Sequence, residues 1–156
     1  MSMYVNFYIK VNDKFAPIGT FNRNSAIGEA FTNRVPFEKV GPITALQLNS
    51  MRVDYRAREF DIKEGIDECK QLIEQILKMD NSVDEKMDAI AETNEEIGYK
   101  TESLNRTKQV VNWIDFLSTI IEEAEDEEKY SDNVLGLKAD AYVYAGVEAS
   151  TEVVNS

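Results

Sequence analysis

The sequence predicts an α+β fold, in which a small antiparallel β-sheet and a short helix carry a long antiparallel helical hairpin of the coiled-coil type. Three patterns support this prediction: a β-hairpin signature near the amino terminus, apolar residues at 4-3 spacing over residues 48–104, and the alternating stretch "ADAYVYAGVEA" near the carboxyl terminus. The 156 residues are predicted to form one domain. Residues 1–43 hold the β-hairpin and short helix, residues 44–127 the helical hairpin, and residues 128–156 an acidic loop, a closing strand and a tail.

The amino-terminal stretch "MYVNFYIKVNDKFAPIGTF" indicates a β-hairpin with its turn at "NDK". Pro17 has no backbone N–H to donate, so we expect it at a sheet edge or a β-bulge. Because a two-stranded hairpin is marginal in water, the strand in "ADAYVYAGVEA" is expected to dock on it. The apolar residues that alternate with polar neighbours in the first strand are Val5, Phe7, Ile9 and Val11.

A short helix is predicted in "NRNSAIGEAF", because Asn24 or Ser25 offers a side-chain cap for its first amide groups. The following "VPFEKVGP" is predicted to be a loop. The aromatic residues of the amino-terminal hairpin are interpreted as core, since a sheet that stacks on nucleic-acid bases would need basic neighbours. These aromatic residues are Tyr4, Phe7, Tyr8, Phe15 and Phe21.

The first long helix is predicted to begin after Ile43 and to reach Met79. Thr44 and Gln47 fit a capping box, and Ile43 with Leu48 fits the hydrophobic staple that accompanies such a box. Apolar residues then repeat at coiled-coil spacing and define the buried seam of this helix. The seam residues are Leu48, Tyr55, Ile62, Ile66, Cys69, Ile73 and Ile76.

The second long helix is predicted to begin near Ser82, which forms a second capping box with Glu85. With three or four residues between them, the two helices are expected to fold back antiparallel, because each has one apolar stripe to bury. Asn94 and Thr101 in the second stripe are expected to define the register of the pair. The predicted seam is Val83, Met87, Ile90, Asn94, Ile97, Thr101 and Leu104.

The later stretch "VVNWIDFLSTII" carries apolar residues all round the helix rather than along one stripe. A helix with this pattern is buried on several sides. The cover is expected to come either from the sheet or from a second subunit.

The sequence disfavours most catalytic chemistry. It contains no histidine, one cysteine and no glycine motif that binds phosphate, which removes histidine bases and thiolate metal clusters. An EF-hand-like start at Asp80 fails because Glu85 stands where glycine is needed and Ala91 stands where an acid is needed. Cys69 is predicted to be a buried structural thiol. We therefore expect no enzyme, no metal site and no cofactor.

The charge of the chain predicts the kind of partner. The net charge is −12, and residues 61–156 contribute −15 against +3 from residues 1–60. Such a field repels nucleic acid and anionic membranes and attracts basic protein surfaces. The amino terminus lacks a signal-peptide pattern, and no run of 18 apolar residues is present, so a cytoplasmic location without membrane insertion is expected.

Two acidic features are candidates for binding a partner. The first, the acidic row, consists of Glu85, Asp88, Glu92, Glu95 and Glu102 along one face of the second long helix. The second, the acidic run, consists of Glu122, Glu123, Glu125, Asp126, Glu127 and Glu128. The row offers one charge per helical turn of about 5.4 Å, whereas duplex DNA offers one per ~1.7 Å, so only the short run matches the charge density of nucleic acid.

The acidic run has two interpretations that the sequence leaves open. Carboxylates at the carboxyl end of a helix oppose its macrodipole and repel one another. Either the helix ends near Ala124 and the remaining acids belong to a solvated loop, or a basic partner relieves the repulsion.

The stretch "VNFYIKVNDKFAPIGTFNRNSAIGEAF", the acidic helical hairpin and the closing "YVYAGVE" strand together resemble small accessory proteins of phages and mobile elements. The resemblance implies an accessory role in the cytoplasm of a bacterial host, such as inhibition of a host or defence protein. The predicted function is a non-catalytic acidic module that binds a basic protein surface, including that of a nucleic-acid enzyme by mimicry of nucleic acid. The alternative is a structural, self-associating coiled-coil protein of an assembly or virion.

Overall fold

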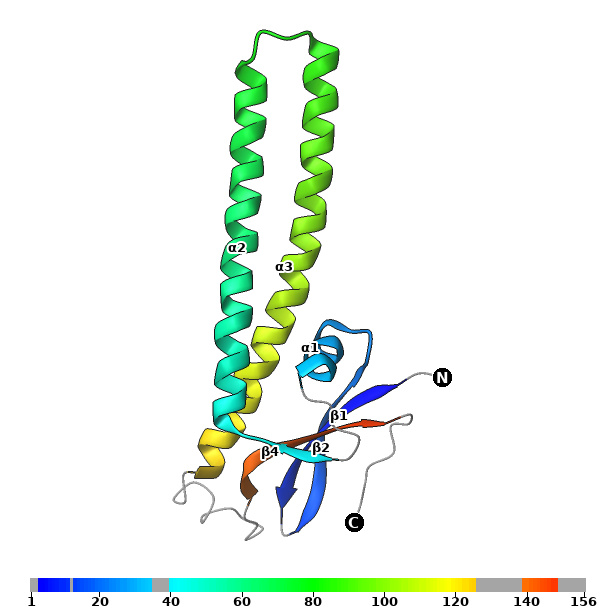
Figure 1. The fold of residues 1–156 in the computed structure, drawn as a ribbon, viewed down its shortest axis with the longest axis vertical. Helices are drawn as coiled ribbons and strands as arrows, with labels where there is room; N and C mark the ends of the chain where they lie inside the picture. The colour runs from blue at the N-terminus through cyan, green and yellow to red at the C-terminus, as the bar shows by residue number, and fades with distance from the viewer. Residues whose placement is uncertain (1–2, 12, 35–39, 126–138, 149–156) are drawn as a thin grey trace. The chain divides into compact units, whose positions relative to one another are not determined.

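A computed structural model describes residues 3–11, 13–34, 40–125 and 139–148 of the chain. The fold is α+β, as the sequence predicts (Figure 1). The chain divides into two compact units. The sheet unit comprises Met1–Val53 and Gln109–Ser156, and the hairpin unit comprises Asp54–Lys108.

The sheet unit is built on four antiparallel strands in the order β2-β1-β4-β3. Their bounds are Tyr4–Val11 for β1, Lys14–Asn22 for β2, Gly41–Ile43 for β3 and Ala139–Glu148 for β4. Pro17 lies on the edge strand β2 beside a bulge, where Phe7 pairs with Gly19 and Tyr8 pairs with Pro17. The predicted docking of the carboxyl-terminal strand on the hairpin is confirmed. The predicted loop 35–42 is wrong at its end, because residues 41 and 42 belong to β3.

Both faces of the central strand β1 are buried, because its alternating side chains join different aromatic groups. On one face, Phe7 makes edge-to-face contacts with the rings of Phe21, Phe31 and Trp113. On the other face, Tyr8 contacts Phe15, which in turn contacts Tyr144 of β4. The prediction that the aromatic residues of the hairpin are core residues is therefore confirmed for Phe7 and Tyr8.

The short helix α1 (Ala26–Arg34) packs on the sheet through Phe31 and begins at a side-chain cap. Of the two predicted caps, Ser25 is the one used: its hydroxyl oxygen accepts a hydrogen bond from the Gly28 amide at 3.0 Å. Gly28 is required by close packing, because a Cβ at this position would lie 2.0 Å from the carbonyl oxygen of Asn22. Residues 22–25 thus supply the side-chain cap of α1 through Ser25 and pack the backbone of Asn22 against Gly28 in the first turn of the helix.

The long helices α2 (Ala45–Lys78) and α3 (Val83–Glu125) begin where the sequence predicts. At α2, Gln47 donates its amide hydrogen to the Thr44 hydroxyl, and the Gln47 side-chain oxygen accepts from the Thr44 amide at 2.8 Å. At α3, the Glu85 amide donates to the Ser82 hydroxyl at 3.3 Å. Both capping boxes are therefore formed at least on their serine or threonine side.

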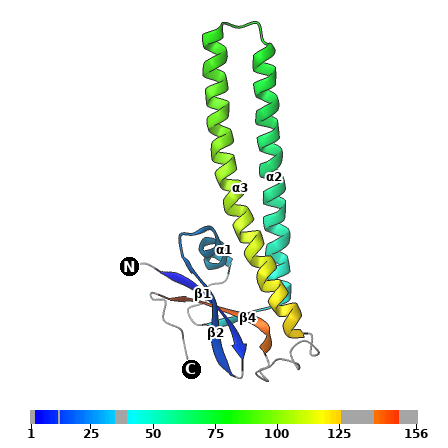
Figure 2. The same cartoon turned by 180° about the vertical axis from the view of Figure 1, so that it is seen from behind.

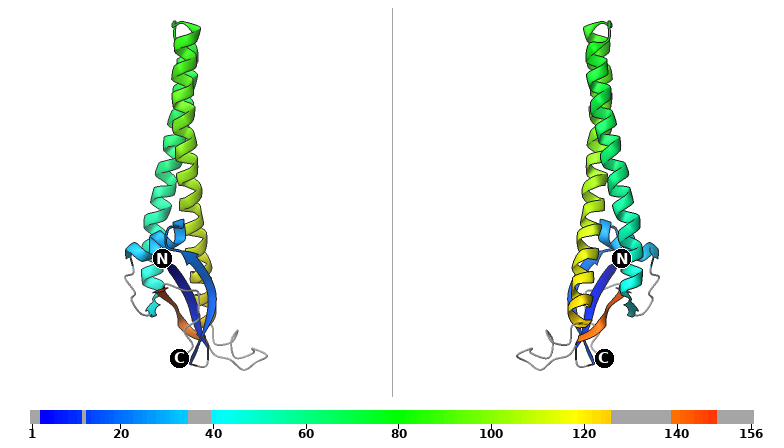
Figure 3. Two further views of the ribbon diagram at one scale, coloured as in Figure 1. Left: turned by 90° about the vertical axis from the view of Figure 1, so that its right-hand side faces the viewer. Right: turned by 90° about the vertical axis from the view of Figure 1, so that its left-hand side faces the viewer.

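In the hairpin unit the two helices lie side by side and antiparallel, in front and rear views alike (Figures 1 and 2). Seen edge-on, one helix lies in front of the other, so this unit is a two-helix ribbon with no third helix (Figure 3). The Lys86 ammonium donates to the Leu77 carbonyl oxygen at 3.3 Å and ties the two helices at the turn. The predicted antiparallel hairpin is confirmed.

The seam of α2 is confirmed within the hairpin unit, whereas the predicted seam of α3 is right for Ile90, Ile97 and Leu104 and wrong for its other four residues. On α3, Val83, Met87, Asn94 and Thr101 are exposed, so Asn94 and Thr101 do not determine the register. The residues that face α2 keep Ile90, Ile97 and Leu104 of the predicted seam. In place of Met87, Asn94 and Thr101, the residue one position earlier faces α2 in each case. The residues that face α2 are Lys86, Ile90, Thr93, Ile97, Lys100, Leu104 and Thr107, all buried or half-buried.

This seam tolerates polar residues because their polar groups form hydrogen bonds within the helix or reach the surface. The hydroxyl groups of Thr93 and Thr107 donate to the carbonyl oxygens of Ala89 and Ser103, both at 2.9 Å. Lys100 runs along Gly65 of α2, where a Cβ would lie 3.3 Å from its Nζ atom, and its ammonium reaches Glu96 at 3.7 Å. The lysine stem therefore covers the seam while its charge stays at the surface.

Candidate protein-interaction surface

The acidic row lies entirely in the hairpin unit, on the side of α3 that points away from α2. Its five carboxylates recur every three, four or seven residues, a spacing that places them on one helical face. All five residues are exposed, whereas the seam residues Ile90, Ile97 and Leu104 on the opposite side are buried or half-buried. The structure thus brings Glu85, Asp88, Glu92, Glu95 and Glu102 together as a continuous exposed row.

Few contacts neutralise this row. Glu85 accepts a hydrogen bond from the Asn81 amide group at 3.0 Å, which does not change its charge. Among the described residues, no lysine or arginine forms an ion pair with Asp88, Glu92 or Glu102. The row is therefore a line of mostly unpaired negative charge, screened only by solvent and salt.

Tyr99 is a member of this surface that the sequence analysis missed. It lies between Glu95 and Glu102 on the same face, is exposed, and donates its hydroxyl hydrogen to the Glu95 carboxylate at 3.1 Å. An exposed aromatic ring beside carboxylates offers both apolar area and a polar tip, a combination typical of protein interfaces. The available signal was its position, four residues after Glu95 in the row.

The acidic run belongs to the sheet unit and is described only in part. Glu122 is exposed, Glu123 is half-buried, and Glu125 is the last residue of α3. Asp126, Glu127 and Glu128 lie outside the described residues, so the choice between a loop and a partner site stays a prediction. The last turn of α3 contains no basic residue that would offset the macrodipole.

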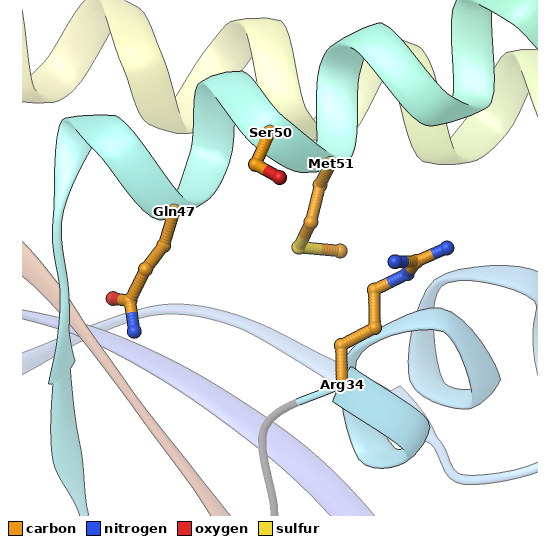
Figure 4. Close-up of a pocket in the computed structure, with 4 residues that line it drawn as sticks. All are labelled: Arg34, Gln47, Ser50 and Met51. Carbon is orange, nitrogen blue, oxygen red and sulfur yellow. The ribbon is translucent and has the colours of Figure 1, made fainter.

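The sheet unit contains a cleft of about 380 Å³ between the end of α1 and the first turns of α2 (Figure 4). Arg34 rises from α1 toward α2, which contributes Gln47, Ser50 and Met51 (Figure 4). Gln47 is engaged in the capping box, and the described residues of the lining include no carboxylate or imidazole that could activate the Ser50 hydroxyl as a base. The described lining therefore offers no nucleophile and base pair for catalysis.

The described residues also lack a metal-binding cluster and a membrane-spanning helix. No group of three or more cysteine, aspartate or glutamate residues in residues 3–11, 13–34, 40–125 and 139–148 is arranged to hold a metal ion. No helix in these ranges has a stretch long and apolar enough to cross a membrane. Cys69 is buried, as predicted.

Comparisons of the chain with protein-family models, with curated proteins and with solved structures found no match. The resemblance to accessory proteins of phages and mobile elements therefore stays a prediction.

Proposed function

We propose that this protein is a non-catalytic binding module that holds a basic surface of a partner protein against the acidic row of α3. The observation that supports the proposal is the continuous exposure of five carboxylates on the face opposite the seam, none of which forms an ion pair with a lysine or arginine among the described residues. A fold needs no such row for its own stability, because exposed like charges repel one another.

The hairpin unit as a whole has the charge that such a role requires. It contains fifteen Asp or Glu residues and nine Lys or Arg residues, a net charge of −6. A surface of this sign increases the rate of encounter with a basic partner and disfavours acidic ones. Tyr99 adds an apolar contact in the middle of the charges.

The spacing of the row favours a protein partner over mimicry of nucleic acid. One carboxylate per helical turn of about 5.4 Å is too sparse to imitate the phosphates of a duplex, but it matches the spacing of lysine or arginine residues on a second helix. The anti-defence role implied by the sequence resemblance is a narrower version of this proposal.

A structural, self-associating role is the second candidate. The exposed apolar side chains near the turn of the hairpin favour it, because clustered exposed apolar area marks an association site. These side chains are Leu77, Met79, Val83 and Met87.

The proposal is tested by removing four of the five charges of the row. In one variant Glu85, Glu92 and Glu95 become Gln and Asp88 becomes Asn. Both this variant and the wild-type chain are immobilised, exposed to a bacterial lysate, and eluted with increasing salt. Proteins that bind the row are expected to be retained by the wild type, to elute at moderate salt, and to be lost from the variant.

A matched control removes the same number of charges from the exposed face of α2 in the same unit. Its substitutions are Asp61→Asn, Glu64→Gln, Glu68→Gln and Glu74→Gln, all at exposed positions. The control is expected to retain what the wild type retains. Equal loss in both variants would show that net charge, and not the row, governs binding and would contradict the proposal.

A further inference from the structure

The helix α3 carries two stripes at coiled-coil spacing, and only one of them is covered within the hairpin unit. Val83, Ile90, Ile97 and Leu104 follow one another at seven-residue intervals and by this spacing belong to both stripes, although Val83 is exposed at the start of α3. The covered stripe continues through Lys86, Thr93 and Lys100 toward α2, whereas the other continues through exposed residues. We name these exposed residues, Val83, Met87, Asn94 and Thr101, the second stripe.

The second stripe has the composition of a helix interface. In a chain with 29% charged residues, the 4-3 series from Val83 to Leu104 contains none. Val83 is 71% exposed and Met87 63% exposed, so both have most of their surface in solvent. A helix with two overlapping heptad stripes can pack against two neighbouring helices at once, and the hairpin unit provides only one.

A groove that a second neighbouring helix would occupy lies beside the second stripe. Its volume is about 360 Å³, with Ile66 of α2 and Leu104 of α3 among its lining residues. Thr101 of the second stripe lines it from one side, and Lys63, Asp67 and Lys70 line it from the other. The opposite flank of the hairpin is filled instead, since Lys100 lies against Gly65 there.

At the outer edge of the second stripe, small residues permit close approach of a docked helix. Acidic residues behind them favour a docked helix that carries basic side chains. The row of residues next to it includes Ala91 and Gly98, and a Cβ at position 98 would meet no atom within 4 Å. Asp88, Glu95 and Glu102 follow at seven-residue intervals just behind these small residues. A helix seated here would therefore bring the residues of its outer flank to this line of acids.

We propose that the second stripe docks an amphipathic helix of a partner protein, whose apolar face enters the groove and whose outer flank carries lysine or arginine. Charge complementarity selects this occupant over a second copy of the chain, because two copies would each bring a net charge of −6 from the hairpin unit. This proposal rests on the proposed function and names the partner as a helix with one basic flank.

The test uses the full-length chain and synthetic helical peptides of about four heptads. The first peptide has leucine at the apolar positions, lysine on one flank and glutamine on the other. The second replaces lysine with glutamate, and the third has the composition of the first in scrambled order. Fluorescence anisotropy of labelled peptides is expected to show binding of the first, with affinities at least about ten-fold weaker for the other two.

Two substitutions that add the same charge locate the binding site. Met87→Glu places a charge in the second stripe and is expected to weaken binding of the lysine peptide by about ten-fold or more. Leu72→Glu adds the same charge at an exposed apolar position on the opposite flank, seven residues after Gly65, and is expected to leave binding unchanged. Circular dichroism verifies that both variants stay folded.

Several results would overturn the inference. They are equal binding of the scrambled peptide, no binding of any peptide, and an equal effect of both substitutions. Dimerisation of the chain alone that Met87→Glu abolishes, measured by light scattering at two concentrations, would assign the second stripe to a second copy. The lysate experiment above stays a separate test: if the acidic-row variant loses partners there while Met87→Glu keeps them, the proposed function stands and helix docking fails.

Discussion

The two units differ in how completely they bury their residues. In the sheet unit, Phe7, Ile114 and Leu117 are 0% exposed. In the hairpin unit, the most deeply buried described residues, Ile76 and Thr93, are still 6% exposed. The sheet unit encloses a core between several elements, whereas the hairpin unit has a single seam between two helices.

This difference indicates which unit contributes most to the stability of the chain. The core of the sheet unit is held by long-range aromatic contacts, and Gly19 lets the indole of Trp113 lie directly on β2, where a Cβ would be 2.6 Å from the ring. The hairpin unit instead devotes most of its residues to solvent-exposed faces. We infer that the sheet unit supplies most of the folding free energy and that the hairpin unit supplies binding surface.

The largest expected effect is that of Phe7→Ala in the sheet unit. Phe7 is fully buried and contacts three aromatic rings, so its truncation leaves a cavity and should lower the free energy of unfolding by about 3–5 kcal/mol. Urea titration followed by the fluorescence of Trp113 measures this loss. A decrease of less than about 1 kcal/mol would contradict the inference that the sheet unit supplies most of the folding free energy, because such a value is typical of sites away from a packed core.

The next effect tests whether the units depend on one another. Ile73→Pro interrupts α2 inside the hairpin unit and should cost about 3 kcal/mol of local helix stability. Far-ultraviolet circular dichroism should lose helical signal, while the emission of Trp113, the only tryptophan and a residue of the sheet unit, should stay that of the folded state. A simultaneous shift of the emission would show that the sheet unit needs an intact hairpin.

A smaller effect is expected at Gly28 of the sheet unit. An alanine Cβ would be forced against the Asn22 carbonyl oxygen, so Gly28→Ala should destabilise the chain by about 1–3 kcal/mol through displacement of backbone. Thermal unfolding compares this variant with the wild type. Unchanged stability would mean that the β2–α1 connection relaxes without cost.

The smallest effect is expected at Gly98 of the hairpin unit and has the opposite sign. Because nothing lies near this position, Gly98→Ala should stabilise α3 by about 0.5–1 kcal/mol through reduced backbone entropy of the unfolded chain. The same thermal unfolding experiment measures it, with circular dichroism as the signal. A destabilising result would indicate that the described open space is filled in solution, for example by a second copy.

Much of the fold could be predicted because it is encoded by neighbouring residues. The capping boxes of Thr44 with Gln47 and of Ser82 with Glu85 follow from side-chain reach over three residues. The seam of α2 follows from apolar periodicity, and the edge position of Pro17 follows from its missing N–H. The exposure of the acidic row was likewise predictable, because charged residues at helical spacing face solvent unless they are paired.

Contacts between segments that are distant in the sequence could not be predicted from the pattern of neighbouring residues. The strand β3 has three residues and contains Pro42, so only its pairing with β4 makes it a strand. The ion pair between Arg52 of α2 and Asp115 of α3 joins two distant residues within the sheet unit, with 2.9 Å between the Nε and Oδ1 atoms. The Nε atom of Arg52 does not meet the geometry of a hydrogen bond, so the contact is an electrostatic one. The cover of "VVNWIDFLSTII" was left open by the sequence, and the sheet contributes to it through Phe7 and Phe21, whose rings contact Trp113 of this stretch.

By itself, the sequence determined that α3 has coiled-coil periodicity and that Ile90, Ile97 and Leu104 belong to its buried side. Only the tertiary structure decided which of the two stripes through these residues faces α2. Apolarity favours the stripe with Val83 and Met87, but the position of α2 selects the stripe with Lys86, Thr93 and Lys100. The physical reason is that threonine satisfies its hydroxyl within its own helix and lysine extends its charge to solvent, so the polar stripe can be covered at little cost and the apolar one is left exposed.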